Sequence, residues 1–274
     1  MNSSDRKREP EVWINAGDRE ASPPRGLHSV IRLGDTWKVL DLSRGYDPKV
    51  ISLDPPSIGR YNEKRRNMYT TDLFAGVRNI HMGLDIWAPA GTPVHAFADG
   101  RVLFLRDNDH PGDYGPTIIT VHEIDSILLR AGETGEAGER TRMGDTGARA
   151  GMGKAGMVET GKVETGKGEA GEEAGIEKSK DNERGSSAIL YALHGHLSRA
   201  SLGVVTEGMP LKKGQVFAEV GKEEENGGWV PHLHFQLSRE RPAEPDLPGV
   251  VAEEDLEEAL HRYPDPRLIL GNLY

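Results

Sequence analysis

Two histidines stand one residue apart in the stretch Val-Pro-His-Leu-His-Phe-Gln-Leu at positions 230–237. The surrounding residues favour a strand, in which side chains alternate between two faces, so His232 and His234 point to the same side. Leu233 and Phe235 then point to the other side, where a hydrophobic core would take them. Such a pair can bind a metal ion or move protons, and it can also be purely structural or lie on the surface. Its function depends on which side chains join it.

His81 and Asp85 form a second candidate group, four positions apart in His-Met-Gly-Leu-Asp and next to a short β-type run. Zinc accepts both ligand types, and a hydrolytic zinc site has three protein ligands and one open position for water. One of the two histidines in 230–237 would complete the set. The other would stand beside the water as a general base or proton shuttle. Asp85 could instead accept backbone hydrogen bonds in a turn, so the spacing alone leaves both alternatives open.

His196 is a third candidate, because it follows a predicted strand, Ala188–Leu193, and precedes Leu-Ser. From the end of that strand it could face the same groove and hydrogen-bond a developing oxyanion. Taken alone, it would equally suit a capping or core position. Six other histidines show no partner spacing and stay unassigned: His28, His95, His110, His122, His194 and His261.

The composition limits the possible partners. The net charge of -10 argues against nucleic acid or an anionic membrane surface as a partner. Cysteine is absent, which excludes disulfides and thiolate metal sites, so any metal must be held by histidine and carboxylate. The amino-terminal residues include no apolar run, and no stretch is long enough to span a bilayer. We therefore expect a soluble protein, cytoplasmic by default.

Short strands dominate the elements that the sequence predicts. Hydrophobic residues make up only 36% of the chain, whereas glycine (34) and proline (17) are plentiful, as in a turn-rich β core. A short helix, with acidic residues at its start and basic residues at its end, is expected just before Pro264. Residues 43–70, with the basic patch Lys64-Arg65-Arg66, are interpreted as an irregular connection. The predicted strands cover 84–87, 94–98, 101–105, 116–124, 188–193 and 216–220, with one or two more within 28–42.

The predicted domain organisation is one domain with two loose segments. Residues 1–27 are polar and are expected to be a flexible lead-in to a single domain at 28–270. A low-complexity insertion at 131–187 interrupts that domain. Aromatic residues are missing from it through position 186, and Val-Glu-Thr-Gly-Lys is repeated at 158–167, so we expect it to be disordered. Without it, the flanking strands would form a simple hairpin.

Three motifs resemble the lysostaphin-like (β-lytic) zinc metallopeptidases. The first runs from His81 through Asp85 into Ala-Pro-Ala-Gly-Thr-Pro-Val and Asp-Gly-Arg-Val; the second is the strand that ends in His196-Leu-Ser; the third is Pro-His-Leu-His-Phe at 231–235. The resemblance implies an antiparallel β-sheet core with a substrate groove, of the duplicated hybrid motif type, with helix only at the periphery. It also implies Zn²⁺ held by His81, Asp85 and His234, with His232 as general base and His196 at the oxyanion.

The resemblance implies that the chain is a zinc-dependent metallo-endopeptidase and that it cuts cell-wall (peptidoglycan-type) or glycine-rich peptides. More narrowly, Asp113-Tyr-Gly-Pro-Thr and Asn226-Gly-Gly-Trp are similar to copies of this domain fused to aminotransferase-like and kinase-like proteins. Two alternatives stay open: a non-catalytic module that binds a peptide or partner on the same fold, and a zinc hydrolase of a small intracellular amide. A complete set of metal-site residues favours the enzyme.

Overall fold

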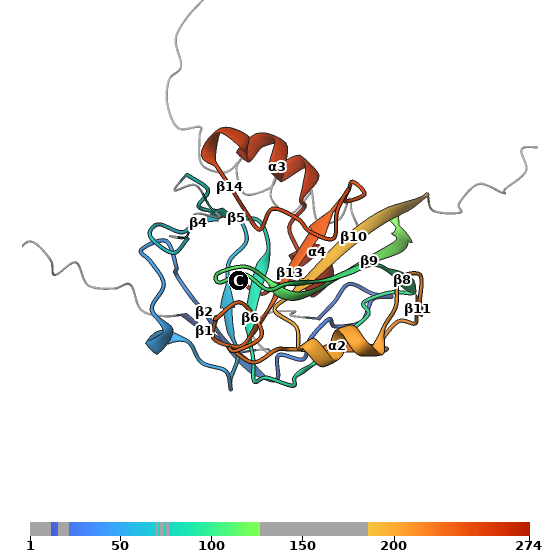
Figure 1. Ribbon diagram of the computed structural model, residues 1–274, viewed down its shortest axis with the longest axis horizontal. Coiled ribbons are helices and arrows are strands. Elements are labelled where there is room, and N and C mark those ends of the chain that lie inside the picture. Colours follow the sequence, from blue (N-terminus) through green and yellow to red (C-terminus); the bar gives the residue numbers. More distant parts are fainter. Residues whose placement is uncertain (1–11, 16–21, 70, 72–73, 75–76, 127–185) are drawn as a thin grey trace, which may run out of the picture.

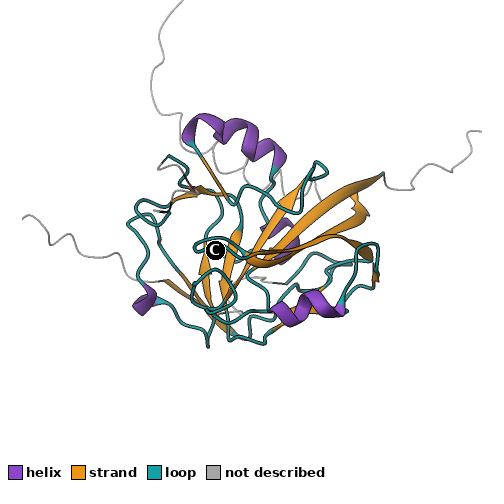
Figure 2. Cartoon of the chain, viewed as in Figure 1, coloured by secondary structure: helices purple, strands orange, loops and turns teal. Residues whose placement is uncertain are grey.

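The computed structural model describes residues 12–15, 22–69, 71, 74, 77–126 and 186–274. Strands form the middle of this part of the chain, and the helices α2 and α3 lie at opposite edges (Figure 1). Figure 2 shows the same division by secondary structure, with long loops between the strands. The predicted fold class, a mainly β structure with a minor C-terminal helix, is confirmed.

Nine strands make up the largest sheet in the part of the chain that the structure describes. All of its neighbouring pairs are antiparallel except β2 with β3, so the sheet is mixed at one position, where an antiparallel core was predicted. The strands, in their order across the sheet, are β1 (Val12–Asn15), β2 (Thr36–Val39), β3 (Ser57–Gly59), β6 (Leu84–Trp87), β13 (His232–Ser238), β10 (Ser187–Gly195), β9 (Gly115–Asp125), β8 (Gly100–Asn108) and β11 (Pro210–Leu211).

Two smaller sheets accompany the large one. One pairs β12 (Val216–Glu219) with β7 (Pro93–His95). The other has the order β14 (Val250–Val251), β5 (Ile80–His81) and β4 (Glu63–Lys64). This three-stranded sheet matters for the site, because β5 ends at one of the candidate metal ligands.

The predicted pairing of the strands on either side of the insertion is confirmed. β9 and β10 run antiparallel from Asp125↔Ser187 to Ile118↔His194 without a break in register. Most of the predicted insertion, 131–185, lies outside the described residues, so its expected disorder stays a prediction. Ser187, the last residue assigned to it, is already the first residue of β10.

Two segments that the sequence analysis assigned to irregular structure contain strands. The flexible lead-in predicted at 1–27 is wrong for Val12–Asn15, because this Val-Trp-Ile-Asn stretch pairs with β2 as strand β1; residues 1–11 and 16–21 lie outside the described part. The irregular connection predicted at 43–70 contains β3, β4 and the 3-10 turn Pro48–Val50. These strands are two or three residues long, too short to show an alternating pattern.

The helices are short. The predicted C-terminal helix is α3 (Leu256–Arg262), preceded by a 3-10 turn at Glu253–Asp255 and ended just before Pro264. Two helices were not predicted: α2 (Arg199–Val204) and α4 (Arg267–Leu270). Both are too brief for helical periodicity to be read from the sequence. None of the helices in the described ranges has the length and apolar character that crossing a bilayer requires.

The two faces of β13 have different environments. Leu233, Phe235 and Leu237 belong to the main hydrophobic core. Each fully buried side chain of this kind contributes about 1.5–3 kcal/mol. The intervening side chains, including His232 and His234, lie on the opposite face, as predicted. A one-residue slip of the strand would exchange the two faces and place imidazoles in the core, so the core fixes the register.

Candidate metal centre and active site

Two neighbouring strands bring the candidate ligands together. In the antiparallel pair β6–β13, Asp85 lies directly across from His234, and Trp87 lies across from His232. His81 ends strand β5 and reaches the same place from the three-stranded sheet. The His-x-x-x-Asp spacing thus spans two strands, and the turn between them carries the chain from one sheet to the other.

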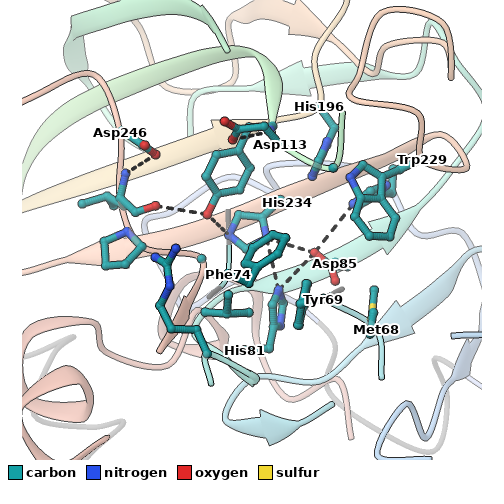
Figure 3. Close-up of a pocket in the computed structure, with 18 residues that line it drawn as sticks. Met68, Tyr69, Phe74, His81, Asp85, Asp113, His196, Trp229, His234 and Asp246 are labelled. Atoms are coloured by element: carbon teal, nitrogen blue, oxygen red, sulfur yellow. Dashed lines mark hydrogen bonds and ion pairs between the residues drawn. The ribbon is translucent and has the colours of Figure 1, made fainter. Parts of the chain in front are cut away.

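The three candidate ligand atoms form a compact triangle. Asp85 Oδ1 lies 3.0 Å from His234 Nδ1 and 3.3 Å from His81 Nε2, and the two nitrogens are 3.2 Å apart. All three side chains are buried. Figure 3 shows them converging on one point at the floor of a pocket.

The hydrogen bond of His81 Nδ1 determines the tautomer of this ring. His81 Nδ1 lies 3.0 Å from the backbone oxygen of Arg60, which can only accept. Nδ1 therefore carries the proton, and Nε2 presents a lone pair to the triangle. A histidine that binds a metal is ordinarily fixed in this way by its second nitrogen.

Gln236 fixes His234 in the complementary tautomer. The Gln236 amide nitrogen donates to the backbone oxygen of Pro248 at 3.3 Å, which turns its Oε1 toward His234 Nε2 at 3.1 Å. His234 Nε2 therefore carries the proton, and Nδ1 is the lone-pair atom. Gly83 gives the ring room, because a Cβ at that position would lie 2.5 Å from His234 Cε1.

This arrangement fits a zinc ion. Two imidazole lone pairs and a carboxylate oxygen would repel one another at 3.0–3.3 Å unless they share a cation. Zinc binds such atoms at about 2.0–2.2 Å in a tetrahedron, which places neighbouring ligand atoms about 3.3–3.6 Å apart, close to the separations seen here. Two nitrogen donors also favour zinc over magnesium or calcium, which select oxygen ligands. His81, Asp85 and His234 would hold the metal, and the pocket lies on the remaining side.

An arginine holds the other oxygen of Asp85. The guanidinium of Arg65 is completely buried, and its Nη1 lies 2.6 Å from Asp85 Oδ2. Burial works to raise the pKa of Asp85, but the neighbouring His81 and Arg65 outweigh it and keep that pKa well below the usual value. Asp85 is therefore ionised and has a fixed orientation. Burial lowers the pKa of His81 to about 4, which keeps this ring neutral and able to act as a ligand at neutral pH.

Two further histidines face the same pocket. His232 Nδ1 donates to the backbone oxygen of Val230 at 2.8 Å, and His196 Nδ1 donates to that of Asn226 at 2.8 Å. Each Nε2 is therefore free of a proton in the neutral ring; that of His232 lies 3.9 Å from Asp85 Oδ1. The ring centroids are 4.0 Å apart.

The electrostatic surroundings keep both rings neutral. Burial lowers the pKa of His232, and burial together with His232 lowers that of His196 well below its usual value. His196 also has a backbone φ of 60°, a conformation that residues other than glycine adopt at an energetic cost. His196 directly follows Gly195, the last residue of β10, and its side chain lines the pocket. Neutral imidazoles with free Nε2 atoms can take up a proton.

The pocket has a volume of about 110 Å³ and two ends of different chemistry. Asp113 and Asp246 line one end, and Trp229 and Met68 lie toward the other, with the metal-ligand triangle between them (Figure 3). The pKa of Asp246 is raised to about 6 by its environment, chiefly by burial and the nearby Asp113.

The five residues singled out from the sequence all reach this pocket. His81, Asp85, His196, His232 and His234 line it. The six histidines left unassigned do not. Of these, His122 and His194 are buried in the core, where they contact Phe97 and Phe217.

Three contributors to the site were missed. Gln236 could have been found, because it continues the period-two face of His232 and His234. Tyr114 lies between His196 and His234, with ring centroids 5.5 and 4.9 Å away, and it was noted only as part of a motif. Arg65 was assigned to a basic patch, and nothing in the local sequence shows that its guanidinium is buried.

Comparisons with known proteins find matches among solved structures only. No protein-family profile matches the sequence, and no curated protein matches it. Among solved structures, the catalytic domain of the antimicrobial peptidase lysostaphin from Staphylococcus simulans is similar at 15% identity, over 76% of this chain and 94% of that one, with a TM-score of 0.34. The catalytic domain of a prophage-encoded M23 protein from Enterococcus faecalis matches at 18% identity, over 71% and 85%, with a TM-score of 0.32.

A zinc-containing peptidase from Vibrio cholerae matches at 18% identity over 80% of this chain but only 46% of its own length, with a TM-score of 0.35. The lysostaphin-like class that the motifs resemble takes its name from the first of these peptidases.

Proposed function

We propose that this chain is a zinc-dependent metallo-endopeptidase. The observation that supports it most directly is the triangle of lone-pair atoms from His81, Asp85 and His234, with two neutral histidines on the pocket side of it. A zinc ion bound there would polarise a substrate carbonyl and lower the pKa of a water molecule. Asp85 brings one negative charge and the histidines bring none, which leaves a bound zinc ion with a net positive charge for this chemistry.

His232 is proposed as the general base. Its Nδ1–H is held by the Val230 oxygen, so Nε2 is the atom that accepts a proton from the attacking water. The lowered pKa keeps the ring unprotonated at neutral pH and thus available. The same proton can then pass from Nε2 to the amine that leaves when the peptide C–N bond breaks. Stacking on Trp87, with ring centroids 5.3 Å apart, fixes the plane of the ring.

His196 is proposed to stabilise the negative charge that develops on the carbonyl oxygen. Because its Nδ1–H is engaged with Asn226, this role requires a second proton on Nε2. The developing negative charge beside the ring favours binding of that proton, although burial opposes it in the resting protein. That proton would be taken up from solvent, separately from the one that His232 removes from the attacking water and passes to the leaving amine.

The proposed substrate is a peptide of the peptidoglycan or glycine-rich type. The motif resemblance suggests this class, and a pocket that continues on both sides of the triangle suits an internal peptide bond. The decisive experiment combines metal analysis of the purified chain with hydrolysis of a panel of cell-wall and glycine-rich peptides. We expect one zinc ion per chain and cleavage that a chelator abolishes. A folded protein without zinc would disprove the proposal, and zinc without cleavage would favour a binding module.

A further inference from the structure

Arg65 lies behind the triangle and takes no part in the chemistry described above. Its side chain is 0% exposed, a rare state for a guanidinium. Its donors reach Asp85 Oδ2 at 2.6 Å, Glu63 Oε2 at 3.0 Å and the hydroxyl of Tyr69 at 3.0 Å. Its Nη2 lies 3.3 Å from the backbone oxygen of Arg60. These partners hold the buried guanidinium in one fixed position behind the candidate metal ligands.

Two of the three candidate ligands meet at this guanidinium. Arg65 binds Asp85 directly, and it shares the Arg60 carbonyl with His81 Nδ1, which lies 3.0 Å from the same oxygen. The absence of a side chain at Gly59 makes space for the guanidinium, because a Cβ at that position would lie 2.6 Å from Arg65 Nη2. One side chain therefore links the orientation of a carboxylate ligand to that of an imidazole ligand.

A cation this close to a metal site would ordinarily repel a second cation. Glu63 offsets this repulsion, because its carboxylate neutralises the charge of Arg65. The Glu63 carboxylate is itself held by the backbone N–H of Leu42, which donates to it at 3.0 Å. The charges of Asp85, Arg65 and Glu63 add up to one negative charge, the same as for Asp85 alone. The pair thus fixes the geometry of the ligand without changing the charge offered to a metal.

Occupation of Oδ2 has a consequence for coordination. A carboxylate can bind zinc through one oxygen or through both. With Oδ2 held by a short charge-assisted bond, only Oδ1 is left for the metal. We propose that Arg65, neutralised by Glu63, is a positioning residue that restricts Asp85 to one-oxygen coordination and so keeps a coordination position open for water. This inference rests on the proposed metal site.

The test measures metal binding and coordination in full-length variants. Arg65→Met removes every donor at similar length, and Arg65→Lys keeps the charge but loses the forked geometry. We expect zinc affinity, from competition with a chromophoric chelator, to fall about 10–100-fold in Arg65→Met and less in Arg65→Lys. In the cobalt-substituted protein, the intense visible bands of four-coordinate Co²⁺ should weaken as Asp85 binds through both oxygens. X-ray absorption of the zinc form should show the extra oxygen.

Controls separate this role from simple stabilisation. Arg267→Met breaks another arginine–carboxylate pair, with Asp265 at 2.6 Å, whose two residues do not line the pocket; it should lower the melting temperature and leave zinc affinity and the cobalt spectrum unchanged. If Arg65→Met does not fold, the cobalt spectrum of Arg65→Lys is compared with that of the wild type, and weaker visible bands in the variant would support the proposed role of Arg65. Unchanged affinity and spectrum in the folded Arg65 variants would overturn this inference alone. A wild-type chain that binds no zinc would overturn the proposed function with it.

Discussion

His234 Nδ1 lies 3.0 Å from Asp85 Oδ1, directly across the β6–β13 ladder. This relationship is the reason that His234, rather than His232, is proposed as the metal ligand. His232, two residues earlier on the same face, is 3.9 Å from the same oxygen and is placed opposite Trp87 instead. The strand register therefore gives two chemically identical side chains different positions relative to the metal site.

The first prediction distinguishes the proposed roles of His234, as metal ligand, and His232, as general base. His234→Ala should lose stoichiometric zinc together with turnover, because one of three protein ligands is gone. His232→Ala should keep one zinc per chain and lose about 10²–10⁴-fold in turnover, as expected when a general base is removed. Metal analysis and peptide hydrolysis check both variants. His261→Ala, at an exposed position on α3, is the matched control. Release of zinc by His232→Ala would reverse the two assignments.

Much of this site could be predicted because strand periodicity is local. Alternation alone places His232 and His234 on one face, and the observed core on the other face of β13 agrees. The pairing of β9 with β10 was predictable for a related reason, since both strands have high β propensity and remain neighbours once the insertion is set aside.

The burial of Arg65 and the pairing of strand β1 could not be predicted, because they depend on contacts with residues distant in the sequence. Arg65 is surrounded by charged residues and resembles a solvated patch, whereas its burial results from Asp85, twenty positions later, and from Glu63. Strand β1 is held in the sheet by its pairing with β2, which lies at a distance in the sequence. Such long-range pairing leaves no periodic signal when the strand has only four residues.

The second prediction concerns Gln236. Because its Oε1 accepts from His234 Nε2, it keeps the lone pair of His234 on Nδ1. Gln236→Leu, which has a similar shape but no acceptor, should lower zinc affinity about 10–100-fold without removing a ligand. Gln236→Glu retains an acceptor at the same place and should bind zinc at least as tightly as Gln236→Leu. Competition with a chelator measures both; equal affinity in wild type and Gln236→Leu would contradict the role.

The third prediction is a loss of stability at acid pH that originates in the core, away from the metal site. Burial lowers the pKa of His122 to about 4 and that of His194 to about 3, against 6.5 in an unfolded chain. Between these values the unfolded state binds more protons, so the stabilisation is complete above pH 6.5 and declines as the pH falls toward the folded pKa. At pH 5 the loss should be about 2 kcal/mol per histidine.

Denaturant unfolding at pH 7.5 and pH 5 measures this loss. His122→Gln can still bond the carbonyl of Ala98 and the hydroxyl of Thr120 but cannot titrate. This variant should therefore lose about 2 kcal/mol less than wild type between the two pH values. His261→Gln, at an exposed position, should behave as wild type. An equal pH dependence in all three proteins would show that His122 does not contribute.

The fourth prediction tests whether the fold needs residues 127–185. The strands on either side are already joined at their ends: Asp125 pairs with Ser187, and the backbone N–H of Ser126 donates to Ser186 at 2.8 Å. Replacing 127–185 with a four-residue turn shortens the connection about fifteenfold, and loop-closure entropy then favours the shortened protein by about 2 kcal/mol. Because all five candidate site residues lie on elements outside this stretch, zinc content and turnover should be retained. A shortened chain that no longer unfolds cooperatively would show that the segment is part of the domain rather than an insertion into it.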